Sequence, residues 1–314
     1  MKRLALFACL GMLHCFAIGQ TPVRFVVGFT PGGPSDILAR SLAEKLSGPL
    51  GQPVVVENRP GAGGNLAAEV VAKSAPDGNT WLLGNNSILA TNQALYRHLS
   101  YDPVRDFAPV ALVAIQPNIL VVHPSVPAHS VPELIAYAKS RPGKLNYASS
   151  GAGAAAHLAG ELFKAMTGVQ MVHVPYKGAQ PALTDVIAGQ CQLMFATSAS
   201  VLPYIKAGRL RALAVTTAQR SRSVPDLPTV GESVPGFEAI TWHGVVVPSA
   251  TPAATVERLN RAINTVLGQP DLHDRLQNLG AETAIGSPQD FAAYIAREIP
   301  KWTKVVRDSG AKAE

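Results

Sequence analysis

Short apolar runs alternate with longer amphipathic segments along almost the whole chain. A short apolar run bounded by glycine, proline or polar residues predicts a buried strand, whereas apolar residues spaced three or four apart predict a helix with one buried face. The predicted strands span residues 25–27, 54–57, 80–83, 111–122 (one long strand or a pair), 145–148, 171–174, 192–196 and 210–216. The predicted helices span residues 65–73, 131–140, 154–166, 181–188, 199–207, 253–268, 271–279 and 288–308.

Strands and helices that alternate in this way predict an α/β fold, with parallel-rich sheets and helices on both faces of each sheet. Two sets of strands, each with its own glycine-rich turn, favour two lobes over one large sheet. We expect one lobe from residues 21–121 plus 247–314 and a second lobe from residues 122–246. The predicted hinge crossings are the extended, apolar segments near residues 121–124 and 244–248. The C-terminal helices are expected to return to the first lobe.

The N-terminal segment has the pattern of a secretory signal peptide. Lys2 and Arg3 precede an apolar run over residues 4–18, and small residues follow at Ala17 and Gly19. The run is too short for a membrane span, so we predict that residues 1–20 are a signal peptide and that the protein is periplasmic. No later segment of the sequence is apolar for long enough to cross a bilayer.

Cysteine and charge content narrow the class of protein further. Cys9 and Cys15 lie in the predicted signal peptide, and the remaining Cys191 cannot form an internal disulfide and is expected to be a buried hydrophobic residue. The net charge of +6 falls by two, to +4, without Lys2 and Arg3. The basic residues form no stripe interleaved with aromatic residues, so we expect no nucleic acid as a partner. The positive excess mildly favours anionic small molecules.

The first glycine-rich turn is the most informative part of the chain. A buried strand pattern runs directly into Gly32 and Gly33, which permit a tight turn and the close approach of a ligand to the backbone. Pro34 suits the first turn of a helix, and Ser35 or Asp36 is expected to cap that helix. The free N–H groups and the positive dipole end of such a helix form a seat for a carboxylate. Taken alone, the segment is better explained as an ordinary turn.

A second turn of the same design follows the strand predicted over residues 145–148. Ser149, Ser150 and the N–H groups of residues 151–155 form a second expected anion seat. The spacing Gly151-x-Gly153 is similar to a dinucleotide-binding fingerprint, but no acidic residue ends the next strand, so we exclude NAD. Tight packing of a helix on a strand explains this segment about equally well when it is considered alone.

Polar residues also follow two other predicted strands. Asn86 and Ser87 come after the strand over residues 80–83, and Thr197 comes after the strand over residues 192–196. Open α/β sheets bind ligands at the carboxyl ends of their strands. Each of these segments alone is better explained as a helix cap, but four such strand ends in two lobes favour a ligand-binding cleft.

Sequence motifs for catalysis, metals and cofactors are absent. The sequence contains no Gly-x-Ser-x-Gly, no His-Glu-x-x-His, no Cys-x-x-Cys and no phosphate-binding loop with its lysine. We therefore predict no enzyme activity, no metal and no cofactor. His157 lies one turn into the helix after the second glycine-rich turn and is a candidate to approach a ligand. An exported hydrolase that uses Ser149 or Ser150 with His157 stays open as an alternative.

Several motifs follow one another in order along essentially the whole mature chain. They are VVGFTPGGPSD at 26–36, VVENRPGAGG at 55–64, PDG at 76–78, YDPVRDF at 101–107, YASSGAG at 147–153, HLAGE at 157–161, VPYKG at 174–178, DLPT at 226–229, WHG at 242–244 and PSATP at 248–252. With these motifs the chain resembles the periplasmic substrate-binding proteins of tripartite tricarboxylate transporters, also called the Bug family.

This resemblance implies a two-lobed, Venus-flytrap binding protein without catalytic activity. Its ligand would be a small carboxylate (a dicarboxylate, tricarboxylate, amino acid or aromatic acid), held by backbone N–H groups and hydroxyls of the two glycine-rich turns. We expect a monomer that delivers this ligand to membrane components of a transporter, and the alternative is a sensor subunit that presents ligand to a membrane signalling protein. The predicted ligand-binding residues are Phe29, Thr30, Gly32, Gly33, Ser35, Asp36, Asn86, Ser87, Ser149, Ser150, Gly153, Ala154, His157 and Thr197.

Overall fold

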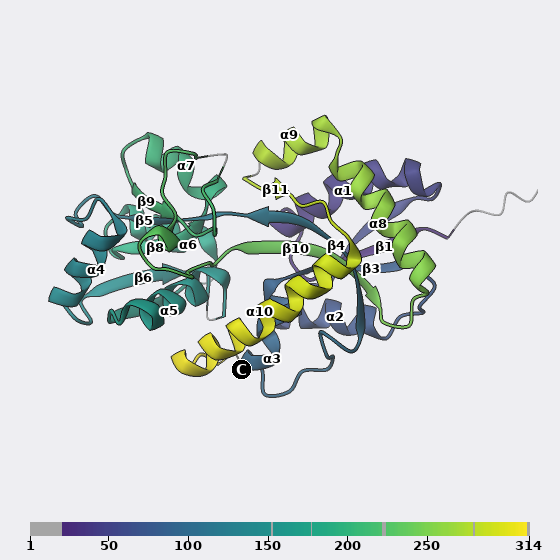
Figure 1. The fold of residues 1–314 in the computed structure, drawn as a ribbon, viewed down its shortest axis with the longest axis horizontal. Helices are drawn as coiled ribbons and strands as arrows, with labels where there is room; N and C mark the ends of the chain where they lie inside the picture. The colour runs from purple at the N-terminus through teal and green to yellow at the C-terminus, as the bar shows by residue number, and fades with distance from the viewer. Residues whose placement is uncertain (1–20, 152, 177, 222–223, 279, 313–314) are drawn as a thin grey trace, which may run out of the picture.

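The computed structural model describes residues 21–151, 153–176, 178–221, 224–278 and 280–312. The predicted signal peptide, with Cys9 and Cys15, lies outside these residues. Two α/β lobes lie side by side along the longest axis of the molecule, and extended strands connect them (Figure 1). Within the described residues, no helix combines the length and the apolar character that crossing a membrane requires.

The first lobe is built on a six-stranded sheet. Its strands, in spatial order, are β11 (Glu282–Thr283), β4 (Phe107–Gln116), β10 (Thr241–Pro248), β3 (Thr80–Asn85), β1 (Val23–Val27) and β2 (Val54–Asn58). Its helices are α1 (Pro34–Leu50), α2 (Asn65–Ala72), α3 (Asn92–Leu95), α8 (Ala253–Leu267), α9 (Pro270–Asn278) and α10 (Pro288–Ser309), with the short turn η1 (Ala62–Gly64) and the π-helix η2 (Ser87–Thr91).

Helices cover both faces of this sheet because apolar side chains point alternately to its two sides. Phe25 and Val27 of β1 belong to the core that α1 and α8 close. Val26, between them, belongs to the core that α2 and α10 close on the opposite face. The short apolar run of β1 is therefore buried on both sides, as a central strand requires.

The second lobe is built on a five-stranded sheet. Its strands, in spatial order, are β7 (Met171–Pro175), β6 (Leu145–Ser149), β8 (Leu193–Thr197), β5 (Asn118–Val122) and β9 (Arg211–Val215). Its helices are α4 (Val131–Ser140), α5 (Ala155–Thr167), α6 (Ala179–Ile187) and α7 (Ser198–Lys206), and the short turn η3 (Val230–Glu232) follows β9. Leu120 and Val122 of β5 pack toward α4 and α5, whereas Ile119 and Val121 pack toward α6 and α7. Cys191 is buried in this second core, as predicted.

Both sheets are mixed rather than parallel throughout. β10 runs antiparallel to β3 and β4, and β5 runs antiparallel to β8 and β9. The reason is that β10 and β5 enter their sheets from the side at which the lobes meet, where the parallel strands end. The predicted two-lobed α/β class is confirmed, and the opposite direction of these two strands is the feature that the alternation of strands and helices did not predict.

The chain passes from one sheet to the other at two places, neither of which lies in the segments near 121–124 and 244–248. It leaves the first sheet after Gln116 and enters the second at Asn118, so Pro117 alone separates β4 from β5. It returns between the end of β9 and Thr241, the first residue of β10. The segments near 121–124 and 244–248 are apolar because they lie inside the two sheets or at a sheet end. Sheet membership therefore favours lobe boundaries at Pro117 and before Thr241, and we propose these in place of the predicted ones.

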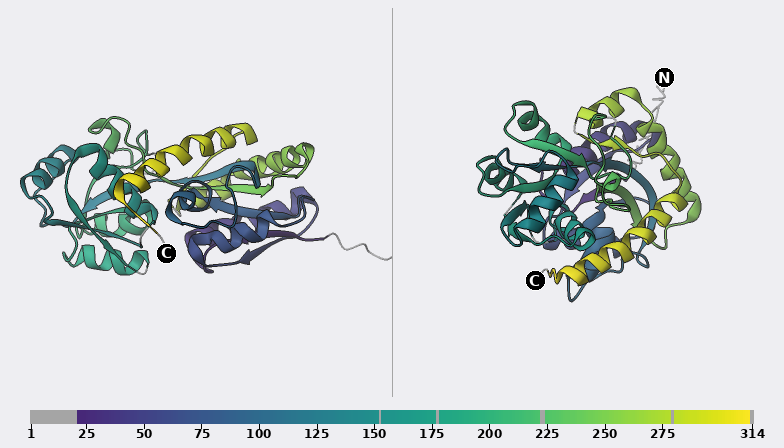
Figure 2. Two further views of the ribbon diagram at one scale, coloured as in Figure 1. Left: turned by 90° about the horizontal axis from the view of Figure 1, so that it is seen from below. Right: turned by 60° about the vertical axis from the view of Figure 1, so that its left-hand side comes forward.

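The C-terminal helix α10 joins the two lobes along one side. It packs on β4 and η2 of the first lobe and on α5 of the second lobe, and it is seen lying across both lobes in the left view of Figure 2. Gly244 of β10 lets this helix approach closely, because a Cβ atom at Gly244 would lie 2.1 Å from the Phe291 ring. Glu298 of α10 is buried and accepts hydrogen bonds from the indole N–H groups of Trp242 (3.3 Å) and Trp302 (2.8 Å).

Replacement of Gly244 by valine should destabilise the protein. The added side chain would force the buried Phe291 ring away from β10, and overpacking of this kind costs ~1–3 kcal/mol of unfolding free energy. Gly48→Val is the matched control, because a Cβ atom at Gly48 meets open space, and it should change the unfolding free energy by less than ~0.5 kcal/mol. Urea unfolding of the three proteins checks this. Equal stability of Gly244→Val and Gly48→Val would contradict the packing described for α10.

Candidate functional site

Strand–helix junctions from both lobes meet at one cavity of about 550 Å³. The junctions β1–α1 and β3–η2 border it from the first lobe, and β6–α5, β7–α6 and β8–α7 border it from the second. Each junction brings the carboxyl end of a strand and the N-terminus of the following helix to the cavity wall. This is the position at which open α/β sheets bind ligands, so the cavity is the candidate site.

Most of the predicted ligand-binding residues line this cavity. They are Phe29, Thr30, Gly33, Ser35, Asn86, Ser87, Ser150, Gly153, Ala154 and Thr197. The structure therefore brings together residues that are far apart in the sequence and that belong to both lobes. Their contact with a ligand remains a prediction.

Gly32 and Asp36 do not line the cavity but shape the loop that does. The Asp36 carboxylate accepts hydrogen bonds from the Gly32 N–H (2.8 Å) and from the Asn58 side chain (2.9 Å), and it pairs with Arg40 (2.9 Å). Burial raises the pKa of Asp36, but the hydrogen bonds from these groups outweigh that effect, and the net shift of the pKa is downward. Gly33, not Ser35 or Asp36, occupies the cap position of α1, and no side chain caps this helix. The predicted cap is wrong because Asp36 points back to Gly32.

Ser149 and His157 support the second glycine-rich loop from behind. The Ser149 hydroxyl lies 3.0 Å from the Gly151 carbonyl and accepts a hydrogen bond from the Gly151 N–H (3.2 Å). His157 Nδ1 accepts a hydrogen bond from the Gly153 N–H at 2.9 Å. Neither residue lines the cavity. Both hold the backbone of the loop in place, and this favours an indirect role for them.

The Ser149 hydroxyl is paired with His173, not with His157. Its Oγ lies 2.6 Å from His173 Nε2. The rings of His173 and His157 stack at 3.9 Å. Burial lowers the pKa of His173 to about 4 and also lowers the pKa of His157. Both imidazoles are therefore neutral near pH 7, which keeps His157 Nδ1 available to accept the hydrogen bond from Gly153.

The described lining of the cavity carries no formal charge near neutral pH. It includes no Asp, Glu, Lys or Arg, while Lys177 falls outside the described residues. Burial lowers the pKa of the lining residue His243 to about 4, so its imidazole is neutral as well. Partial positive charge comes instead from the helix N-termini, each equivalent to roughly half an elementary charge. The cavity is thus suited to a small anion that accepts hydrogen bonds from N–H and O–H groups.

Several lining residues were missed from the sequence. The polar ones are Asn92, Tyr96, Gln116, Thr241 and His243. Gln116 and Thr241 lie where the chain passes between the two sheets, so crossings placed there would have predicted them. Gly178 and Ala179 line the cavity at the N-terminus of α6, after β7. The strand followed by a helix around VPYKG is the sequence pattern that could have predicted them. For Asn92 and Tyr96, which follow the π-helix, no local pattern gave a signal.

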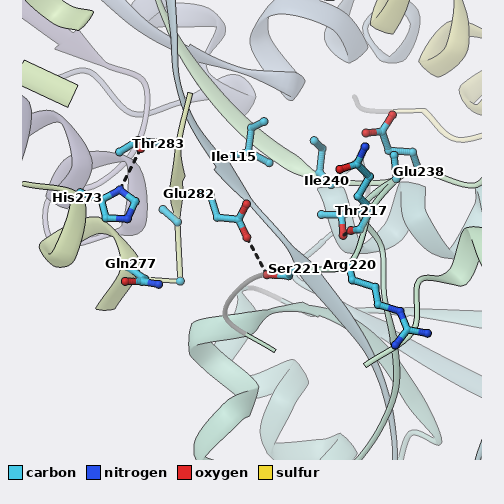
Figure 3. Close-up of a pocket in the computed structure, with 14 residues that line it drawn as sticks. Ile115, Thr217, Arg220, Ser221, Glu238, Ile240, His273, Gln277, Glu282 and Thr283 are labelled. Carbon is cyan, nitrogen blue, oxygen red and sulfur yellow. Dashed lines mark hydrogen bonds between the residues drawn. The ribbon is translucent and has the colours of Figure 1, made fainter. Parts of the chain in front are cut away.

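A second cavity, of about 410 Å³, lies on the other side of the connecting strands (Figure 3). Ile115 and Ile240 line it, whereas the next residue of each, Gln116 and Thr241, lines the first cavity. Glu282 of β11 reaches across this second cavity and accepts a hydrogen bond from Ser221 of the second lobe (2.8 Å). None of the predicted ligand-binding residues lines it, and its described lining includes none of the strand–helix junctions that border the first cavity. We therefore assign the candidate site to the first cavity.

Metal binding has no support in the part of the chain that the structure describes. No group of three or more His, Cys, Asp or Glu side chains is arranged there so that it could hold a metal ion. The acidic side chains near the site, Asp36 and Glu161, are paired with Arg40 and Lys164.

Two α/β lobes, connected by extended strands and lined with helix N-termini where they meet, define a two-lobed periplasmic solute-binding protein. A family model described as "Tripartite tricarboxylate transporter family receptor" matches residues 38–311, and the chain belongs to this family of periplasmic solute-binding proteins. The resemblance inferred from the sequence motifs is thereby confirmed.

Relatives and solved structures agree with this family. The chain is 40% identical over 293 residues to Protein BugT of Bordetella pertussis, which covers 93% of this chain and 90% of that one. Among solved structures, R. palustris Rpa4515 with adipate is 43% identical with a TM-score of 0.81, covering 93% of this chain and 99% of that chain. MatC from Rhodopseudomonas palustris with bound malate is 35% identical with a TM-score of 0.77, covering 91% and 98%.

The burial of His243 predicts a specific dependence of stability on pH. The pKa of His243 is about 4 in the folded protein and near 6.5 in the unfolded chain, so below pH 6.5 the unfolded chain takes up a proton that the folded protein does not. Between about pH 7.5 and about pH 5, this group should cost the folded protein roughly 2 kcal/mol. The unfolding free energy of wild type should therefore fall by about that much more than that of His243→Gln, measured by urea unfolding at both pH values.

The exposed His129 provides the control for this comparison. His129→Gln, which leaves His243 in place, is measured at the same two pH values. A His243→Gln protein with the same pH dependence as the wild type would show that His243 titrates in the folded protein as it does in the unfolded chain.

Proposed function

We propose that this protein captures a small carboxylate between its two lobes and delivers it to the membrane components of a tripartite tricarboxylate-type transporter. One observation carries the proposal: helix N-termini of both lobes border a single cavity whose described lining has no formal charge. The family to which the chain belongs supports the role in transport.

The carboxylate would be held by hydrogen bonds and helix dipoles instead of an ion pair. N–H groups in the first turn of a helix have no acceptor within that helix, so a carboxylate that reaches α1 and α5 can accept from them. Hydroxyls of Thr30, Ser35 and Ser150 lie in the same cavity and can donate as well. Burying a cation in the wall would cost desolvation free energy, and the described lining contains no cation. Such a site can bind an anion and still release it.

A small aliphatic dicarboxylate is the ligand class that we favour. The cavity volume of about 550 Å³ is in the range of sites for small molecules. Phe29, Leu95 and Tyr96 offer apolar surface for a short carbon chain, and Asn85 and Gln116 offer polar groups for its second end. The structures of related proteins with adipate and with malate support this choice.

Ligand entry would require the lobes to move apart. Leu95 of the first lobe lies against Gly153 of the second, since a Cβ atom at Gly153 would be 2.7 Å from the Leu95 side chain. Leu95 and Gly153 both line the cavity, so this contact between the lobes borders it. Rotation about the passages near Pro117 and Thr241 would widen the opening there.

The alternatives from the sequence receive less support. A sensor subunit would use the same cavity, but the family is described by its role in transport. A hydrolase would need Ser149 or Ser150 beside a catalytic base. Ser149 Oγ contacts His173 instead of His157, but Ser149 is fully buried, does not line the cavity and also bonds the Gly151 backbone, so its hydroxyl is not placed to meet a ligand there. We further propose that the chain is exported by its N-terminal signal peptide and acts as a monomer.

Titration of the purified protein with adipate and malate by calorimetry tests the proposed function. At least one of them should bind, and the matching diamide, which keeps the shape but lacks the negative charges, should bind more weakly by ~100-fold or more, because hydrogen bonds to a charged group are the stronger ones. Equal binding of acid and diamide would contradict capture of a carboxylate.

A pair of glycine variants locates the site in the same titration. Gly33→Val places a side chain at the N-terminus of α1, in the cavity wall. It should lower affinity for the acid by ~100-fold, which corresponds to the loss of about two hydrogen bonds to a charged group. Gly48→Val, in the same helix but away from the cavity, should bind as the wild type does. Normal affinity in a folded Gly33→Val protein would place the ligand elsewhere.

A further inference from the structure

His243 and Ser35 form a buried hydrogen-bonded pair in the wall of the candidate site. His243 Nε2 lies 2.9 Å from Ser35 Oγ, and both residues line the cavity. Their exposed fractions are 2% and 7%. His243 lies near the start of β10, where the chain has returned to the first sheet, whereas Ser35 lies in the first turn of α1. The register of β10 on β4 shifts between His243 and Gly244.

The surroundings of the imidazole determine which of its nitrogens carries the hydrogen. A neutral imidazole has one N–H donor and one acceptor nitrogen. His243 Nδ1 is buried and has no hydrogen-bond partner among the described residues. A buried donor without a partner is rarer than a buried acceptor without one. The hydrogen is therefore assigned to Nε2, which donates it to Ser35 Oγ.

This direction of the hydrogen bond leaves the Ser35 hydroxyl hydrogen for another acceptor. Within the described residues, the bond to His243 is the only hydrogen bond of the Ser35 side chain. The hydroxyl lies at the cavity wall, beside the N–H groups of the first turn of α1. A hydroxyl that accepts one hydrogen bond becomes a better donor in the next one, because bonds in a chain polarise one another.

We propose that His243 is a positioning residue for the ligand: by donating to Ser35 Oγ, it turns the Ser35 O–H toward a carboxylate oxygen in the cavity. This inference rests on the proposed function, since it assumes an anion at the α1 side of the site. It has a consequence for specificity. The ligand atom that the Ser35 O–H faces should accept a hydrogen bond, as a carboxylate oxygen does.

The first test needs no ligand and measures the tautomer of His243 by ¹⁵N NMR of the imidazole nitrogens. Comparison with the His243→Gln spectrum identifies the signals of His243. We expect the hydrogen on Nε2 and an unprotonated Nδ1 at neutral pH. A hydrogen on Nδ1 would overturn the inference, because Ser35 would then donate to the imidazole and not to the ligand.

The second test is a double-mutant cycle for adipate and malate binding, measured by calorimetry on wild type, Ser35→Ala, His243→Phe and the double variant. Each single variant should lose ~10-fold in affinity or more, as expected for one hydrogen bond to a charged group. His243→Phe should lose less than ~2-fold further in the Ser35→Ala protein if it acts through Ser35. His243→Gln retains an N–H donor and should recover most of the affinity lost in His243→Phe.

The outcomes separate this inference from the proposed function. Wild-type binding with independent, additive losses in the cycle would overturn the role of His243 and leave the proposed function intact. Absence of carboxylate binding in the wild type would overturn both. Urea unfolding of each variant establishes that the proteins compared are folded, and His243→Gln provides the comparison if His243→Phe is not.

Discussion

Helix N-termini that face one cavity from two separate lobes are the constraint on which the rest of the structure depends. Their first N–H groups have no acceptor within the helix, so they must meet solvent, a loop or a ligand. The strands β1, β3, β6, β7 and β8 all end near the cavity, and each is followed in the sequence by one of these helices. The two sheets therefore place the N-termini of these helices around one cavity. The strands β10 and β5 run opposite to the parallel strands because each of them starts on the side where the lobes meet.

Within the described residues, the charged side chains near the site lie behind the loops instead of in the cavity. Asp36 holds the first glycine-rich loop and is itself paired with Arg40. Glu161, paired with Lys164, accepts a hydrogen bond from Tyr147, whose ring stacks with that of His173 beneath the second loop. The opposite charges within each ion pair largely cancel at the distance of the cavity. The loops in front of these pairs present N–H and O–H groups to the cavity. An anion bound there would meet dipoles fixed in advance, at no further cost of reorganisation.

Much of this arrangement could be predicted from local sequence patterns. The apolar run in β1, the glycine turn after it and Pro34 at the start of α1 are local features, and the structure places them as expected. The junctions after β3, β6 and β8 were likewise found from polar residues that follow apolar runs. What could not be predicted depends on contacts between distant segments. The cap of α1 failed because Asp36 has partners at Gly32 and Asn58, and His243 was missed because only the pairing of β10 brings it to Ser35.

A crystal structure of the protein with adipate or malate would test the central claim most directly. The account predicts one carboxylate of the ligand within hydrogen-bond distance of N–H groups in the first turns of α1 and α5, with the Ser35 hydroxyl as a further donor. A ligand bound outside the cavity between the lobes, or a carboxylate held mainly by a lysine or arginine side chain, would contradict it.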